Sequence, residues 1–121
     1  MHQENIQKAR EKLQLDEQVL LAELGAFVSP DDVTRGGEFG DYIAIGSKWL
    51  ADHRVRIRDL ICDNEQVAKV RGDKALEVAT IAEIIVDLIL GINGALIVSV
   101  LVVRSGIDGL CADELPTDDG C

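Results

Sequence analysis

Glu83 and Asp87 are the acidic residues whose spacing comes nearest to a metal site. They stand four residues apart, so on a helix their carboxylates share one face. A carboxylate-bridged di-metal bundle also requires a Glu-x-x-His pair, and the sequence contains none. We therefore expect no bound metal. We interpret the two acids, together with Glu77, as part of a polar stripe that faces solvent or the basic residues Arg54 and Arg58.

The two histidines offer little basis for acid–base or nucleophilic catalysis. His2 is terminal, and His53 falls on the apolar face of the helix expected over 42–62. Cys62 follows His53 by nine residues, or two and a half helical turns, so the two side chains point to opposite faces. We expect His53 to be a core or interface residue. The sequence predicts no catalytic residues and no cofactor, and therefore a protein that is not an enzyme.

The three cysteines are Cys62, Cys111 and Cys121. An odd, scattered set is a poor disulfide framework. The first residues are polar and lack the apolar segment of a secretory signal. Together these features predict reduced thiols and a cytoplasmic location.

Charge narrows the class of partner. The formal net charge of −10 argues against nucleic acid, because phosphate contacts need a basic surface. Arg54 and Arg58 lie one helical turn apart and form a basic patch in this acidic chain. With Trp49, Glu83 and Asp87, they are the residues we expect to contact a protein partner.

These side chains require helices to position them. Hydrophobic residues make up 47% of the chain but only four residues are aromatic, which indicates an aliphatic core. The apolar periodicity predicts a single all-α domain over 1–110, a bundle of three or four helices, with an acidic flexible tail over 111–121. The expected helices span 3–24, 42–62, 74–90 and 94–104, with a glycine-rich loop at 29–41 and a polar joint at 63–73.

The glycines of the expected loop, in "GGEFG" at 36–40, do not indicate phosphate binding. The segment lacks the GK[ST] ending of a P-loop and the spacing of a dinucleotide-binding turn. In the polar joint, Gly72 is expected to break the chain and Asp73 to cap the following helix.

The uncharged run "LILGINGALIVSVLVV" at 88–103 decides between a core and a membrane segment. Gly91 suits the left-handed position after a helix, and Asn93 suits the cap of the next. We therefore expect a central apolar helical hairpin. Two alternatives stay open: a strand over 95–103, giving an α+β fold, or a single membrane span near 84–104 with the N-terminus inside.

The expected function is that of a small adaptor or accessory subunit. It would act through helical contacts with a protein partner or with itself as a homo-oligomer. The reason is the excess of helix that is apolar on most sides, which so short a chain can scarcely enclose. A membrane-inserting protein is the alternative.

Overall fold

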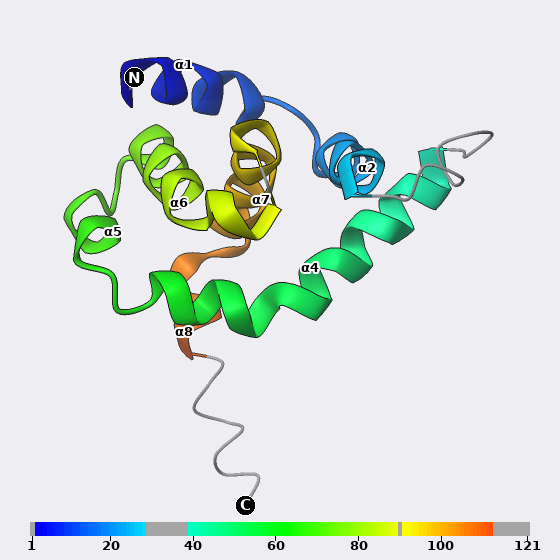
Figure 1. Ribbon diagram of the computed structural model, residues 1–121. Helices are drawn as coiled ribbons and strands as arrows, with labels where there is room; N and C mark the ends of the chain where they lie inside the picture. The colour runs from blue at the N-terminus through cyan, green and yellow to red at the C-terminus, as the bar shows by residue number, and fades with distance from the viewer. Residues whose placement is uncertain (1, 29–38, 90, 113–121) are drawn as a thin grey trace, which may run out of the picture.

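The computed structural model describes residues 2–28, 39–89 and 91–112, and every regular element within them is a helix. Figure 1 shows the arrangement, in which α6 and α7 lie at the centre and the other helices surround them. The all-α prediction is confirmed, with more helices than expected, some of them short. The described helices are α1 (His2–Lys12), α2 (Glu17–Val28), α4 (Phe39–Ile61), α5 (Glu65–Lys69), α6 (Lys74–Ile89), α7 (Ile92–Ser105) and α8 (Ile107–Ala112).

The helical hairpin of α6 and α7 forms the core. Every residue of α7 from Gly94 to Val103 is buried, and α7 packs against α1, α2, α6 and α8. Ser99, the one hydroxyl in that run, donates to the carbonyl of Ala95 at 2.7 Å, so its burial leaves no unmet hydrogen bond. The aliphatic core expected from the composition is confirmed, and the strand alternative over 95–103 is wrong.

The uncharged run at 88–103 is divided between α6 and α7. The two residues expected to cap these helices do not take the predicted roles. Gly91 has φ 160° and ψ 145°, an extended rather than left-handed conformation, and it occupies the cap position itself. Asn93 lies inside the first turn of α7, so its predicted role as the cap is wrong. The span proposed over 84–104 is broken here. None of the described helices is both long and apolar enough to cross a bilayer.

The first predicted helix, 3–24, is two helices. The amides of Gln14 and Leu15 bond to carbonyls three residues back, at 3.2 and 3.1 Å, which tightens and ends α1. The guanidinium of Arg104, on α7, donates to the freed carbonyl of Leu13 at 2.6 Å. Arg104, which is distant in the sequence, therefore provides the hydrogen bond that this carbonyl would accept from a backbone amide in a continuous helix.

Helices α2 and α4 form a close antiparallel pair across two glycines. A Cβ at Gly25 would overlap the backbone carbonyl of Tyr42, and one at Gly46 would overlap that of Leu21. These contacts show that α2 runs forward as α4 runs back. The helix predicted over 42–62 is confirmed as α4. The expected glycine-rich loop lies outside the described residues except for Phe39–Asp41, which begin α4.

The joint predicted over 63–73 contains the short helix α5. Asn64 caps it by accepting from the amides of Gln66 and Val67. Asp73 caps α6 as predicted, since its Oδ1 accepts from the amide of Leu76 at 3.2 Å.

The disulfide between Cys62 and Cys111 corrects the prediction of reduced thiols for these two residues, and Cys121 lies outside the described residues. Their Cα atoms are 5.6 Å apart and the residues are separated by 49 positions. The bond ties the segment after α4 to α8. Cys111 and Ala112 thus belong to α8 rather than to the tail predicted over 111–121, and the rest of that tail lies outside the described residues. The cysteines therefore no longer support a reducing compartment.

Candidate functional site

Helix α4 borders two hollows. The first, which we call the aromatic groove, has a volume of about 390 Å³ and is lined by Phe27 and Val28 of α2, Trp49 of α4, and Leu88 and Ile89 of α6. Phe27 remains 45% exposed. Its ring lies over Gly94 of α7, where a Cβ would come within 2.7 Å of a ring carbon. Gly94 therefore lets the ring settle against the core helix while one side stays open.

Trp49 is held in the groove wall by His53. The two rings stack with centroids 3.9 Å apart and an angle of 15° between their planes. His53 Nδ1 lies 2.8 Å from the carbonyl oxygen of Trp49, a contact that requires Nδ1 to carry the proton. His53 is thus a packed, hydrogen-bonded residue, as its position on the apolar face of α4 suggested.

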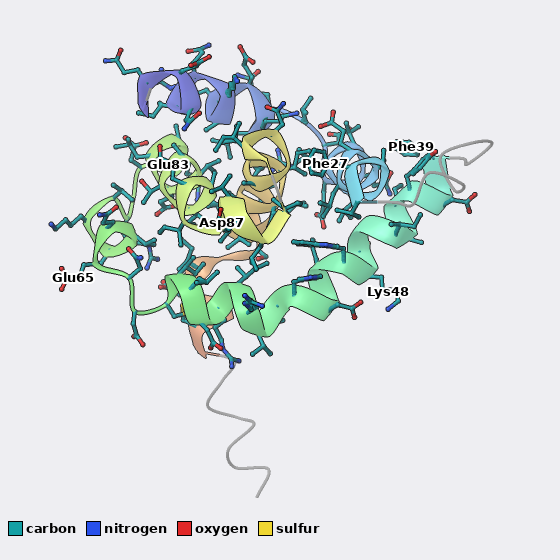
Figure 2. The ribbon with its side chains drawn as sticks, viewed as in Figure 1. Phe27, Phe39, Lys48, Glu65, Glu83 and Asp87 are labelled. Atoms are coloured by element: carbon teal, nitrogen blue, oxygen red, sulfur yellow. A yellow bond between two sulfur atoms is a disulfide. The ribbon has the colours of Figure 1, made fainter. Side chains whose placement is uncertain are left out.

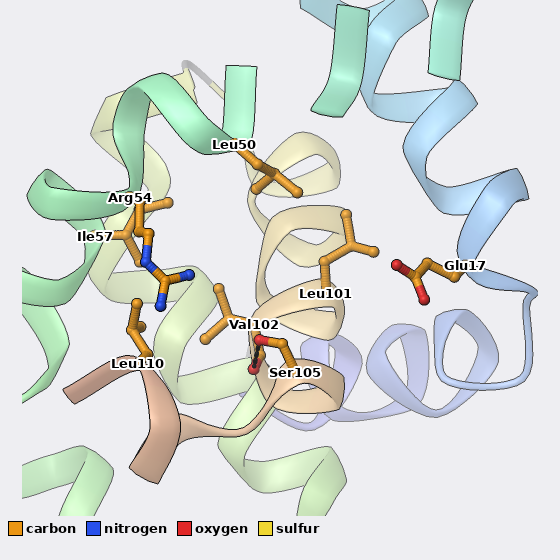
Figure 3. A pocket seen from close by; sticks show the side chains of 8 residues that line it. All are labelled: Glu17, Leu50, Arg54, Ile57, Leu101, Val102, Ser105 and Leu110. Atoms are coloured by element: carbon orange, nitrogen blue, oxygen red, sulfur yellow. Dashed lines mark hydrogen bonds between the residues drawn. The ribbon is translucent and has the colours of Figure 1, made fainter. Parts of the chain in front are cut away.

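The second hollow, which we call the charged cleft, lies further along α4 and has a volume of about 170 Å³. Among the described residues, its walls are aliphatic and three polar side chains reach its edge. Figure 3 shows Arg54 entering from α4 and Glu17 from α2 on the opposite side, with Leu101 between them. The lining residues are Glu17, Leu50, Arg54, Ile57, Leu101, Val102, Ser105 and Leu110.

The five residues predicted to contact a partner do not form one surface. Trp49 lines the groove and Arg54 lines the cleft. The side chain of Arg58 is only 19% exposed and has its Nε 3.9 Å from the carboxylate of Asp59. The predicted basic patch is therefore an exposed arginine next to a mostly covered one.

The predicted acidic stripe on α6 is also divided. Glu83 and Asp87 are exposed, and Glu83 accepts from the side-chain amide of Asn5 on α1 at 3.1 Å. Figure 2 shows Glu83 on the side of α6 near α1, and Asp87 one turn further along the helix. Glu77, from the same stripe, is buried.

Glu77 organises the start of α6. Its Oε2 accepts from the amide of Gly72 at 2.8 Å and lies 3.4 Å from Nε of Arg71. Arg71 also donates to Asp108 of α8 at 2.9 Å, and this hydrogen bond raises the pKa of Arg71 above its ordinary value. Arg71 thus links the start of α6 to α8, in a structural role.

The described residues contain no cluster of three or more His, Cys, Asp or Glu that could hold a metal ion. The linings of the two hollows present an aromatic surface in one and opposed charges around an aliphatic floor in the other.

Several lining residues were not predicted from the sequence. Phe27 was missed because the first helix was expected to end at Leu24, before the aromatic residue. Leu110 was missed because the domain was expected to end there. Because aromatic residues are rare in this chain, Phe27 could have been identified as a candidate contact residue from the sequence.

Comparisons of the chain with protein-family models, with curated proteins and with solved structures give no match.

Proposed function

We propose that the chain is a non-enzymatic helical interaction module that self-associates through the aromatic groove. The placement of its aromatic residues is the main support. Phe27, Phe39, Tyr42 and Trp49 are the complete set, all four belong to α2 or α4, and none is among the fully buried core side chains. Aromatic residues are enriched where proteins contact one another.

The arrangement of α2 and α4 favours a second copy of the chain as the occupant of the aromatic groove. Gly25 lies against Tyr42, and Leu21 against Gly46. Continuing that antiparallel register brings Phe39 opposite Val28, which lines the groove. Phe39 is 53% exposed, so each copy carries a projecting ring beside a hollow, an arrangement that two copies can match reciprocally across a two-fold axis. In Figure 2, Phe27 and Phe39 lie at the same end of the molecule, away from Glu65.

Phe39→Ser tests the proposal because Phe39 is exposed and its loss should leave the monomer folded. Burial of a phenylalanine contributes about 1.5–3 kcal/mol, so the variant should weaken the dimer about tenfold or more. Sedimentation equilibrium over a micromolar concentration series measures the dissociation constant. Val55→Ser is the control, since Val55 is 57% exposed on the same helix but lies about four turns away from Phe39.

The dependence on ionic strength provides a second test of self-association. Two copies with a formal charge of −10 each repel one another, so added salt should strengthen an apolar dimer. A wild-type chain that stays monomeric at high micromolar concentration and in high salt would refute self-association. Equal effects of Phe39→Ser and Val55→Ser would refute the groove as its site.

A further inference from the structure

The charged cleft has the size and lining of a site for a small aliphatic molecule. Its five apolar lining residues, Leu50, Ile57, Leu101, Val102 and Leu110, are all aliphatic. A volume of about 170 Å³ is close to that of a protein cavity that accepts benzene, so it has room for a chain of about six carbons. Such walls favour a flexible aliphatic segment and provide no aromatic ring for stacking.

The charged groups of the cleft have opposite signs and stand on opposite sides. Figure 3 shows the guanidinium of Arg54 and the carboxylate of Glu17 separated by Leu101. Arginine has five N–H donors in a planar fork that suits a carboxylate, so the guanidinium of Arg54 can hold one beside the interaction that it already makes within the chain. Glu17 suits an ammonium group. Ser105 donates its hydroxyl hydrogen to the carbonyl of Val102 at 3.0 Å, so its oxygen is left as an acceptor on the cleft edge.

A molecule with one charge fits this arrangement less well than one with two. A simple aliphatic carboxylate would direct its methyl end towards Glu17 and cover that carboxylate from water, which is unfavourable. It would also meet the field of a chain whose formal charge is −10. A molecule with a carboxylate and an ammonium at the two ends of an aliphatic chain avoids both penalties.

We propose that the charged cleft binds a dipolar ω-amino carboxylate, whose carboxylate pairs with Arg54 and whose ammonium pairs with Glu17. The same chemistry is offered by a free ω-amino acid and by a lysine at the C-terminus of a peptide. The proposal is independent of self-association through the aromatic groove.

The test uses the full chain and a matched series of probes: 6-aminohexanoate, hexanoate and hexylammonium. Two-dimensional ¹H–¹⁵N NMR follows the amide signals as each probe is added. We expect 6-aminohexanoate to shift the signals of Leu101, Val102 and Leu110, and to bind about tenfold more tightly than either singly charged probe. Nα-acetyl-lysine identifies the source: tighter binding than 6-aminohexanoate indicates a C-terminal lysine, and weaker binding indicates a free ω-amino acid.

Charge-removing variants assign the two ends of the ligand. Arg54→Gln and Glu17→Gln should each lower the affinity for 6-aminohexanoate about tenfold. Arg56→Gln, an exposed arginine on the same helix, and Glu65→Gln, an exposed acid at the start of α5, should not. Hexanoate that binds as tightly as 6-aminohexanoate, or no cleft shifts with any probe at tens of millimolar, would overturn the proposal.

Discussion

Gly25 and Gly46 face each other where α2 crosses α4, so closely that a Cβ on Gly46 would lie 3.1 Å from the backbone nitrogen of Gly25. The atoms that a new methyl group would meet at both glycines belong to backbone, which cannot rotate away. We expect Gly25→Ala and Gly46→Ala each to destabilise the protein by about 3 kcal/mol, the upper range for overpacking. Chemical denaturation followed by circular dichroism measures the change.

Gly40→Ala is the control for this crossing. A Cβ at Gly40 meets nothing within 4 Å, and alanine favours a helix more than glycine does. The variant should therefore be neutral or slightly more stable than the wild type. A loss of stability equal to that of Gly25→Ala would show that the glycines matter for a reason other than close approach.

The disulfide should be a main source of stability for the α8 end of the fold. Cys62 and Cys111 close a loop with a sequence separation of 49, and the chain-entropy model assigns about 4 kcal/mol to a loop of that length. The double substitution of Cys62 and Cys111 by serine should lower the free energy of unfolding by about 2–4 kcal/mol, measured without reductant.

Reduction provides the control for the cysteine pair. With dithiothreitol present, the wild-type chain should become as unstable as the double serine variant, while the variant itself should not respond. The disulfide would be contradicted if the unfolding curve of the wild-type chain did not change with reductant and all of its thiols reacted with a thiol reagent.

The sequence was a good guide to elements with continuous apolar periodicity. The helices expected over 42–62 and 74–90 correspond to α4 and α6 within three residues at each end. The turn between α6 and α7 was found from Gly91 and Asn93, yet neither residue adopts the predicted capping role. The presence of a glycine and an asparagine indicated that the helix breaks here. Which residue caps α7 depends on how α7 packs.

The features that the sequence did not reveal depend on contacts between distant residues. Leu13 to Asp16 contain neither glycine nor proline, and the break there is supported by Arg104, 91 positions away. The pairing of Cys62 with Cys111 likewise follows from the fold that places α8 beside the end of α4. In the candidate site, Trp49 and Arg54 were predicted, whereas Phe27 was hidden by an early helix boundary.

Glu77 should be important for stability even though it was predicted to lie on a polar stripe. It is only 5% exposed and accepts from the amide of Gly72 at 2.8 Å. Glu77→Ala leaves that amide without its acceptor and should cost about 2 kcal/mol. Glu77→Gln keeps an acceptor oxygen and should lose less. Thermal unfolding compares them, with Glu11→Ala on the exposed face of α1 expected to change stability by less than about 0.5 kcal/mol.

Trp49 provides a direct optical measurement of the aromatic groove, because it is the only tryptophan in the chain. His53 covers one face of its indole ring at a centroid distance of 3.9 Å. His53→Ala should expose that face to water, move the fluorescence emission to longer wavelength, and cost about 0.5–1.5 kcal/mol for the lost stacking. Arg56→Ala, at an exposed position on the same helix, should leave the emission unchanged. An emission maximum that is the same in His53→Ala as in the wild type would show that the imidazole does not shield the indole, and the wall of the groove would then have to be held by other contacts.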